Sequence, residues 1–448
     1  MQSLIQYLSD KKILLLGFGV EGQSSYRFLR KYLPKNSINI ADKNPKLREN
    51  PLIHKDDNCF FGENYLEAVK NADIILKSPG IKMQEVLAIH PKAKISSQSD
   101  LMFRFFPSHC IGITGTKGKS TTSTLLHYLL SQRMKDVFLV GNIGKAAFDF
   151  VDISEEAFFV YELSSHQLQS VRHSPHISIL LNFFEEHLDY YKDYEAYKKA
   201  KFAICRYQQE NDIFIYDKDD AAIAKLISEE QTLSRKISFS NKDKSAAFFS
   251  DGNSIQSAGK KIYDLHSEKK LLGRHNEKNI MAVLAAIQAL GIETDELSAA
   301  ISTFTPLEHR LEYIGEENGI LFYNDSIATI AEACIAAVEA LGKVETLLLG
   351  GFDRGINYLP LIKFLIKRKE IKHLIFMGEA GNRMQEILNA QKHDKANFSA
   401  VSMKDAVEIA KRVTTKGKIC LLSPAASSYD KYKNFEERGK DYKKIALQ

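Results

Sequence analysis

Residues 112–122 of the 448-residue chain, GITGTKGKSTT, place glycines, lysines and hydroxyl side chains at a spacing suited to a polyphosphate. A short apolar segment precedes them, and residues 123–130 follow with apolar side chains at helical spacing. A glycine loop between a strand and a helix directs backbone N–H groups at phosphate oxygens. Lys119 would add positive charge at the β- and γ-phosphates, and the Ser120 hydroxyl would face Mg²⁺. We predict that this loop binds ATP, although Ile113 stands where longer loops of this kind have glycine.

Further apolar segments, separated by helical patterns, predict a largely parallel sheet with helices on both faces. They are residues 137–140, 157–161, 177–181 and 212–216. Ligands of such sheets bind at the carboxyl ends of the strands. Glu162 follows the second segment directly and would hold Mg²⁺ through carboxylate oxygens, with a structural hydrogen bond as the alternative. His187 would suit a metal as a neutral imidazole. Lys201 has the spacing of a solvated helix residue.

The first hundred residues predict a smaller α/β unit. A strand at residues 12–16 is followed at once by GFGVEG, a helix at residues 24–33 and a second strand ending in Asp42. This is the pattern of a dinucleotide-binding unit, in which a phosphate lies on the helix N-terminus. A nicotinamide cofactor, another nucleotide and a structural turn all remain open, and the second phosphate loop argues against a simple dehydrogenase. A third strand, residues 73–77, ends in Ser78-Pro79-Gly80.

The last third predicts another α/β domain, because apolar segments again alternate with helical stretches. Its predicted strands are residues 320–323, 346–349, 373–376 and 419–422. Before it, residues 240–273 suggest an antiparallel addition, and a helix at residues 276–290 ends at Gly291. We therefore expect domains at residues 1–104, 105–305 and 306–448.

Composition excludes several classes of protein. The net charge is only +5 and basic pairs are scattered, so we expect no nucleic-acid partner. No apolar run has membrane-spanning length and the first ten residues lack the pattern of an export signal, so we expect a cytoplasmic protein without a membrane partner. The five cysteines are widely spaced without a CxxC pair, which predicts free thiols.

Several motifs together resemble the Mur ligases, ATP-dependent amide-forming enzymes of peptidoglycan precursor synthesis. They are GTKGKST at 115–121, GNIG at 141–144, ELSS at 162–165, the loop around His187, GRHNEKN at 273–279, HRLE at 309–312 and NDS at 324–326. Residues 423–439, SPAASSYDKYKNFEERG, resemble the C-terminal signature of the branch that adds glutamate. The resemblance covers nearly the whole chain. It implies an α/β protein with a Rossmann-like N-terminal domain, a central P-loop ATPase-like domain and a C-terminal Rossmann-like domain.

The resemblance implies two Mg²⁺ ions, with Mn²⁺ as an alternative. Ser120 and Glu162 would bind one, and His187 would bind the other together with a carbamylated Lys201, since carbamylation gives an amine the oxygens that a hard cation requires. The catalytic residues would be Lys119, Glu162, His187 and Lys201. The residues implied for ATP are Gly115, Thr116, Lys117, Gly118, Lys119, Ser120, Thr121, Asn276, Asn279, Arg310 and Asp325.

For the other substrates, the resemblance implies that the first domain binds UDP rather than NAD. The matching residues are Gly17, Phe18, Gly19, Asp42, Ser78, Pro79, Gly80, Asn142 and Ser164. The third domain would bind the acceptor glutamate through Thr329, Arg354, Ser428, Tyr429 and Phe435.

The implied reaction joins UDP-N-acetylmuramoyl-L-alanine to D-glutamate through an acyl phosphate, in a monomeric enzyme whose third domain closes before chemistry. Two departures concern the acceptor. Ile327 replaces a lysine that meets the glutamate carboxylate in the family, and Arg354 stands where lysine is frequent. L-glutamate is therefore the alternative acceptor. Glu186 also replaces a more usual aspartate before the histidine.

Other readings are weaker. A later Mur ligase or a folylpolyglutamate synthase-type ligase is disfavoured by the C-terminal signature at residues 423–439. A catalytically silent nucleotide-binding or regulatory protein is disfavoured because the chain has all five of the residues concerned, Lys119, Ser120, Glu162, His187 and Lys201. A NAD-dependent dehydrogenase would not require the second phosphate loop.

Overall fold

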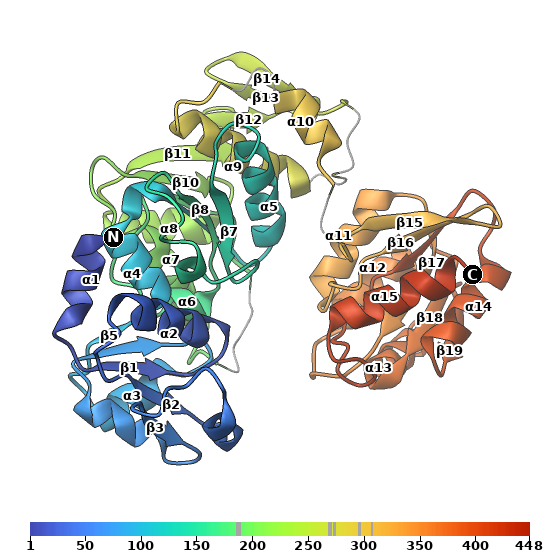
Figure 1. Ribbon diagram of the computed structural model, residues 1–448. Helices are drawn as coiled ribbons and strands as arrows, with labels where there is room; N and C mark the ends of the chain where they lie inside the picture. Colours follow the sequence, from blue (N-terminus) through green and yellow to red (C-terminus); the bar gives the residue numbers. More distant parts are fainter. Residues whose placement is uncertain (185–189, 268–270, 272–274, 294–296, 306–307) are drawn as a thin grey trace. The chain divides into compact units, whose positions relative to one another are not determined.

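The structure is a computed structural model that describes residues 1–184, 190–267, 271, 275–293, 297–305 and 308–448. The chain forms two compact units (Figure 1). The first consists of Met1–Ser267 and Glu277–Ile301, and the second consists chiefly of Ser302–Gln448. The domain boundaries expected near residues 104 and 305 remain predictions.

The N-terminal sheet of the first unit is parallel throughout, with the strand order β3-β2-β1-β4-β5. Its strands are β1 (Ile13–Leu16), β2 (Asn39–Asp42), β3 (Asn58–Phe61), β4 (Ile74–Lys77) and β5 (Ile95–Ser96). Its helices are α1 (Gln2–Ser9), α2 (Val20–Tyr32), α3 (Met83–Ile89) and α4 (Gln98–Phe105), with 3₁₀ turns η1 (Pro45–Glu49), η2 (Tyr65–Asn71) and η3 (Pro107–His109).

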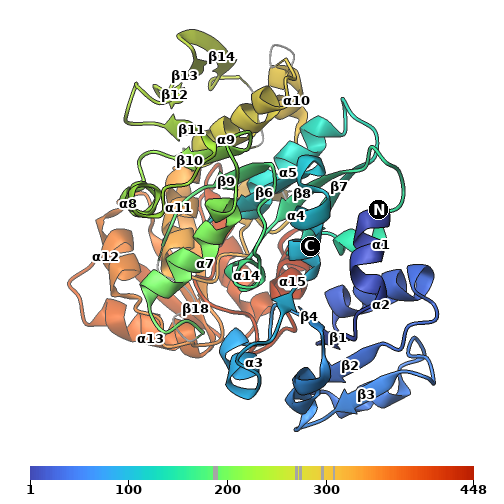
Figure 2. The ribbon, with the colours of Figure 1, turned by 90° about the vertical axis from the view of Figure 1, so that its left-hand side faces the viewer.

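Both faces of this sheet are buried because its central strand β1 is apolar at every position. Ile13 and Leu15 pack into the core that includes residues of α1, α2 and α4. Leu14 and Leu16 pack with residues of η2 and α3. Figures 1 and 2 show α2 and α3 on opposite sides of the strands.

The second sheet of this unit has the order β14-β13-β12-β11-β10-β9-β6-β8-β7. Its strands are β6 (Cys110–Thr114), β7 (Val137–Gly141), β8 (Phe158–Glu162), β9 (Ile177–Leu180), β10 (Ile213–Asp217), β11 (Arg235–Ser240), β12 (Phe248–Ser250), β13 (Ser254–Ser257) and β14 (Lys260–Asp264). The helices are α5 (Lys119–Leu130), α6 (Ser165–Leu168), α7 (Tyr194–Arg206), α8 (Ala221–Glu230), α9 (His275–Ala289) and α10 (Leu297–Thr303), with η4 (Ala147–Asp149). Pairing is parallel from β12 to β7 and antiparallel among β12, β13 and β14.

The second unit has one sheet in the order β15-β16-β20-β17-β18-β19, parallel except for the hairpin of β15 and β16. Its strands are β15 (Glu312–Glu317), β16 (Ile320–Asn324), β17 (Val344–Gly350), β18 (His373–Met377), β19 (Ala396–Ala400) and β20 (Ile419–Leu422). One face packs against α11 (Ala331–Leu341), α12 (Leu359–Lys367) and α13 (Gly378–Asn389), and the other against α14 (Met403–Val413) and α15 (Phe435–Ala446).

The sequence patterns predicted most of the elements of the structure. The predicted α/β class is confirmed, and the predicted strands and the antiparallel addition are all present within one or a few residues of the expected bounds. The helix expected at residues 24–33 begins earlier, at Val20, directly after Gly19. The strands β3, β5, β11, β15 and β19 were not predicted. All five cysteines are free thiols, and only Cys59 is exposed.

No helix within the described residues is long and apolar enough to cross a membrane.

Gly22 allows α2 to start against the end of β1. A Cβ at this position would lie 2.2 Å from the carbonyl oxygen of Gly17 and 3.1 Å from its carbon. Both are backbone atoms, so relieving the clash would require a shift of the main chain and not only of a flexible side chain. Gly22→Ala is expected to destabilise the first unit by about 1–3 kcal/mol, the range for overpacking. Calorimetry should show a lower unfolding temperature.

Gly80→Ala is the matched control, because a Cβ there meets no atom within 4 Å. An unfolding temperature lowered equally by both substitutions would contradict the close approach at Gly22.

Candidate active site and substrate pocket

The phosphate-loop candidate lies at the switch point of the central sheet, where β6 is flanked by β8 and β9. The loop leaves β6 and enters α5 through Gly118, which has a φ of 85°. A Cβ on Gly118 would lie 2.5 Å from Asn279 Oδ1, so this position requires glycine on both counts. The loop therefore leads directly into the N-terminus of α5, the position at which the sequence predicts a phosphate.

Asn182, at the end of β9, holds the loop in shape. Its backbone carbonyl accepts a hydrogen bond from Thr116 N at 2.9 Å. Its side-chain Oδ1 accepts one from Lys117 N at 2.8 Å, and its Nδ2 donates to Lys117 O at 3.0 Å. The Thr116 hydroxyl lies 2.9 Å from the hydroxyl of Tyr197. Neighbouring side chains thus fix the conformation of the loop, and Asn182 makes most of these contacts. No function was assigned to Asn182 from the sequence.

Two amino groups converge on one carbonyl oxygen of this loop. Lys119 Nζ donates to Gly115 O at 3.0 Å and to Thr116 O at 2.9 Å. Lys201 Nζ donates to the same Gly115 oxygen at 2.8 Å, and the residue is only 2 % exposed. Lys201 is therefore a buried part of the site, whereas its helical spacing alone indicated a solvated position.

Glu162 ends β8 and is fully buried. Asn142 Nδ2 donates to its Oε1 at 2.7 Å, and the hydroxyl of Ser123 donates to its Oε2 at 3.3 Å. Each carboxylate oxygen retains a further lone pair, which suits a hard cation. Ser123 and Ser120 share the first turns of α5, so the structure brings Glu162 to the helix that begins with Lys119.

The remaining ATP and metal residues predicted in the chain up to Asn279 are placed as follows, and Asn276 among them belongs to the second unit. Thr121 is buried in α5, and Asn276 and Asn279 are buried in the first turns of α9. His187 lies outside the described residues. Among the residues that are described, no three His, Cys, Asp or Glu side chains are grouped as a metal site.

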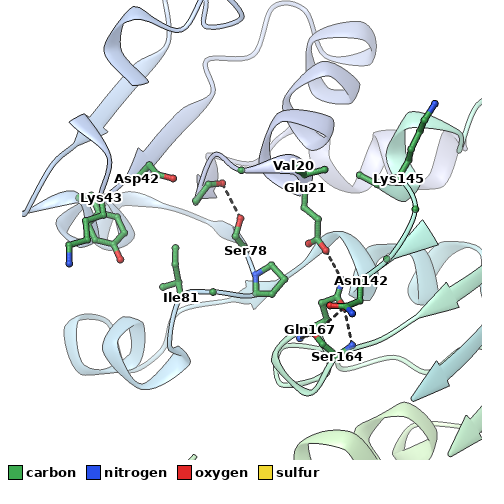
Figure 3. A pocket seen from close by; sticks show the side chains of 18 residues that line it. Val20, Glu21, Asp42, Lys43, Ser78, Ile81, Asn142, Lys145, Ser164 and Gln167 are labelled. Carbon is green, nitrogen blue, oxygen red and sulfur yellow. Dashed lines mark hydrogen bonds between the residues drawn. The ribbon is translucent and has the colours of Figure 1, made fainter. Parts of the chain in front are cut away.

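A cavity of about 500 Å³ opens at the carboxyl ends of β1 and β4 and extends to the loop after β7 and to α6 (Figure 3). It thus lies at the switch point of the N-terminal sheet. Eight of the nine residues predicted for the UDP group line it, namely Gly17, Gly19, Asp42, Ser78, Pro79, Gly80, Asn142 and Ser164. The exception is Phe18, whose buried ring packs against Tyr26 with ring centroids 5.6 Å apart.

Asp42 holds the glycine loop in shape. Its Oδ2 accepts a hydrogen bond from Phe18 N at 2.7 Å, and its Oδ1 accepts one from Asn44 N at 2.8 Å. The carboxylate therefore fixes the glycine loop, while the residue also lines the cavity.

Sequence reasoning missed other residues that line this cavity. They include Glu21, Lys43, Tyr65, Lys145 and Gln167. Glu21 lies inside the glycine motif itself, and Gln167 follows the ELSS motif, so both were within reach of the pattern. Lys43, Tyr65 and Lys145 carry no motif that would single them out.

The sheet of the second unit also has a point at which the strand order reverses, where β20 lies between β16 and β17. Polar residues again follow the strands there. Asp325, directly after β16, accepts a hydrogen bond from the hydroxyl of Ser423 at 2.7 Å and one from Leu311 N at 3.3 Å. Burial raises the pKa of Asp325 to about 7, against the opposing effects of these hydrogen bonds and of the Arg310 charge. Arg310 and Asp325 are thus neighbours, as their common assignment to ATP implies.

A buried arginine ties two loops of this unit together. Arg438 is 2 % exposed and donates to Ser326 O at 2.8 Å, to Ala426 O at 3.0 Å and to Ser427 O at 3.2 Å. Burial lowers its pKa to about 10. Arg438 therefore fixes the loop after β20 against the loop after β16.

The acceptor candidates lie on the loops that follow β16, β17 and β20. Arg354 Nη2 donates to Thr329 O at 3.0 Å, so these two residues are together. Ser428 is buried, Tyr429 is 69 % exposed, and Phe435 begins α15. The Phe435 carbonyl accepts a hydrogen bond from the Ser326 hydroxyl.

The raised pKa of Asp325 predicts a pH dependence of stability. Between the pKa of an unfolded aspartate, about 4, and the folded value of about 7, only the folded protein holds the proton. The stabilisation is complete below about pH 4 and is lost as the pH rises through about 7, with a slope of at most about 1.4 kcal/mol per pH unit. Asp325→Asn should remove this slope in chemical unfolding curves.

Glu386→Gln, at an exposed position of α13, serves as the control and should leave the slope unchanged. An Asp325→Asn protein with the full wild-type slope would contradict the assignment.

Comparison with known proteins identifies the family. Residues 113–287 match the Mur ligase middle domain. Two curated relatives named UDP-N-acetylmuramoylalanine–D-glutamate ligase are similar over nearly the full length. The protein from Clostridium botulinum (strain Kyoto / Type A2) is 33 % identical over 453 residues, covering 98 % of this chain and 97 % of its own. The protein from Clostridium tetani is 31 % identical with the same coverage.

Solved structures show the same fold. MurF from Thermotoga maritima, in complex with ADP, has a TM-score of 0.61 at 16 % identity and covers 100 % of this chain and 99 % of its own. MurC from the same organism has a TM-score of 0.59 at 17 % identity, with 96 % and 98 % covered. Together with the full-length curated relatives, these findings show that the chain belongs to the Mur ligase family.

Proposed function

We propose that this protein is an ATP-dependent ligase that joins D-glutamate to UDP-N-acetylmuramoyl-L-alanine in peptidoglycan precursor synthesis. The relatives that carry this name match 98 % of the chain. The structural observation that supports the proposal most directly is the position of Asn142. Its side chain lines the substrate cavity (Figure 3). The same side chain donates to Glu162, beside the phosphate loop. A substrate held in the cavity would thus extend toward ATP.

The first half-reaction would use the phosphate loop. An oxygen of the alanyl carboxylate attacks the γ-phosphorus, and the bond to the β-phosphate oxygen breaks, giving an acyl phosphate and ADP. The Lys119 ammonium donates to Gly115 O and Thr116 O in this structure. In the reaction it would bind the phosphate oxygens and stabilise the negative charge that develops on them.

Mg²⁺ would be held by Glu162 and Ser120, and it would neutralise phosphate charge when bound. A second ion would require His187 and carbamylated Lys201. The buried Lys201 amine lies 2.8 Å from Gly115 O, at the base of the loop, so a carbamate on this residue would supply oxygen ligands for a hard cation there. Mn²⁺ would fit the same oxygen ligands.

The second half-reaction would take place with glutamate bound on the second unit. Its amine nitrogen attacks the acyl carbon, phosphate leaves, and the amine loses a proton. Arg354 and Thr329 are the candidates for the glutamate carboxylates, because Ile327 has no hydrogen-bonding group. Arginine binds a carboxylate through two parallel hydrogen bonds, so it would replace the missing lysine. Ser428, Tyr429 and Phe435 would complete the pocket.

We further propose a monomer in the cytoplasm, the compartment in which ATP and the UDP-linked precursor occur together. L-glutamate is the second candidate acceptor, and Ile327 is the observation that favours it, since it changes the very group that would meet a carboxylate.

Phosphate release from ATP, measured with UDP-N-acetylmuramoyl-L-alanine and either D- or L-glutamate, tests the function. Release with D-glutamate alone is expected. Release with L-glutamate alone would retain the ligase mechanism and replace the acceptor. No release with either would overturn the proposal.

Lys119→Ala should lower kcat by about 10²–10³-fold, because a preorganised charge at a developing anion contributes on that scale. Glutamate-dependent phosphate release measures it. Lys135→Ala, at an exposed position after α5, is the control and should retain full activity. Near-normal turnover of Lys119→Ala would contradict the phosphate-loop assignment.

Arg354→Ala should raise the KM for glutamate by about tenfold or more, the cost of losing a charge-assisted pair, with little change in the KM for ATP. Arg354→Lys should recover part of the loss, because it restores the charge without the planar fork. Equal KM values for glutamate in all three proteins would remove Arg354 from the acceptor site.

A further inference from the structure

The substrate cavity contains a carboxyl group where its proposed ligand carries negative charge. Glu21 lies in the first turn of α2, beside the glycine loop, and lines the cavity together with Gly17 and Gly19. In Figure 3 its side chain extends from α2 toward Gln167 and Asn142. A helix N-terminus with a glycine loop favours phosphate, whereas a carboxylate in the same wall would repel it. The position of Glu21 therefore calls for a chemical explanation.

One oxygen of Glu21 has a fixed role as an acceptor. Gln167 Nε2 donates to Glu21 Oε1 at 2.7 Å. The orientation of this amide is set by Ser164, whose backbone N–H and hydroxyl both donate to Gln167 Oε1, at 3.0 and 3.1 Å. No hydrogen bond to Glu21 Oε2 occurs within the described residues. This second oxygen is the one available to a ligand.

The charged and titratable groups around Glu21 come from several elements. Lys77 of β4 is buried, with its Nζ donating to Ser78 O at 3.0 Å and to Ile81 O at 2.9 Å. Tyr161 of β8 is buried nearby and interacts electrostatically with Glu21. Lys43 and Lys145 line the same cavity and are exposed. The Asp42 carboxylate also lines it, but both of its oxygens already accept backbone hydrogen bonds.

Burial favours the neutral forms of both Glu21 and Lys77. It raises the pKa of Glu21, opposed by the hydrogen bond from Gln167 and the charge of Lys77. Burial also lowers the pKa of Lys77 to about 8, opposed by Glu21. A diphosphate brought into the cavity would favour the protonated form of Glu21 further, since like charges disfavour ionisation.

A neutral carboxyl group satisfies every contact at this point. Its carbonyl oxygen, Oε1, accepts the hydrogen bond from Gln167, and a hydroxyl at Oε2 donates to an anionic ligand. An ionised group offers no donor and adds one negative charge.

We propose that Glu21 binds the UDP-linked substrate as a neutral carboxyl group, with Oε1 held by Gln167 and the Oε2 hydroxyl donating to a diphosphate oxygen. One proton is then taken up with the substrate wherever Glu21 is ionised in the free protein. This inference rests on the proposed function, because it takes the UDP-linked substrate as the ligand of the cavity.

The proton makes binding dependent on pH in one direction. Affinity falls as the pH rises, because each bound substrate requires a proton that becomes scarcer, with a limit of about tenfold per pH unit. Glu21→Gln mimics the neutral group: its carbonyl accepts from Gln167 and its amide donates to the phosphate. The variant should match the wild type at low pH and bind more tightly at high pH.

The experiment is calorimetric titration of the full chain with UDP-N-acetylmuramoyl-L-alanine, without ATP. It is carried out between about pH 6 and about pH 9, which lies mostly between the ordinary pKa values of histidine and lysine. Buffers of different ionisation enthalpy give the number of protons taken up. Proton uptake should be smaller in Glu21→Gln than in the wild type. Lys77 is present in both proteins, and the Glu21 charge favours its protonated form, so proton uptake by Lys77 would be larger in Glu21→Gln. A smaller uptake in the variant therefore reports Glu21.

Glu85→Gln, at an exposed position of α3, is the matched control for loss of one nearby negative charge. It should keep the proton uptake and pH dependence of the wild type. Unfolding temperatures of both variants show that they are folded.

Several outcomes would overturn the inference. If Glu21→Gln binds more weakly than the wild type throughout, the carboxylate itself contacts the ligand. If all three proteins show the same pH dependence, Glu21 does not take up the proton. In both cases phosphate release by the wild type would leave the proposed function standing. If the wild type neither binds the substrate nor releases phosphate, the function fails, and the inference fails with it.

Discussion

Parallel strands impose the constraint on which the sites of this protein depend: their carboxyl ends meet at one edge, and a crevice forms where the strand order reverses. This happens once in each sheet, at β1 and β4, at β6 with its two neighbours, and at β20 between β16 and β17. The glycine loop of the substrate cavity, the phosphate loop and the loop beginning at Ser423 follow these strands. One topological rule therefore accounts for the position of all three candidate sites.

Within these crevices, buried and partly buried polar side chains hold the loops in shape. Asn182 fixes the phosphate loop, Asp42 fixes the glycine loop, and Arg438 joins two loops of the second unit through main-chain carbonyls. Each of them satisfies backbone groups that would otherwise be left without partners in a tight turn. The binding surfaces are consequently preorganised, so that less conformational entropy is lost when a ligand binds.

The sequence predicted the α/β class, the sheet strands rich in apolar residues and the residues that lie on motifs. It did so because buried parallel strands are continuous apolar runs and because glycine loops must keep their spacing. It failed for β3, β11, β15 and β19, many of whose side chains are not buried, and for β5, which has only two residues. It also missed Lys43 and Tyr65, which reach the cavity through tertiary folding alone. Lys201 shows the limit best: its helix spacing resembles that of a surface residue, and only the packing against Gly115 reveals a buried amine.

Asn142 carries a consequence for how this protein can change over generations. Its single amide faces the substrate cavity and bonds the buried Glu162. A substitution of Asn142 that improved the fit of a ligand in the cavity would also remove the hydrogen bond that Asn142 donates to the Glu162 carboxylate. Selection on the cavity and selection on the surroundings of Glu162 are therefore coupled at this position. A substitution at Lys43, on the exposed rim of the cavity, would leave this hydrogen bond in place.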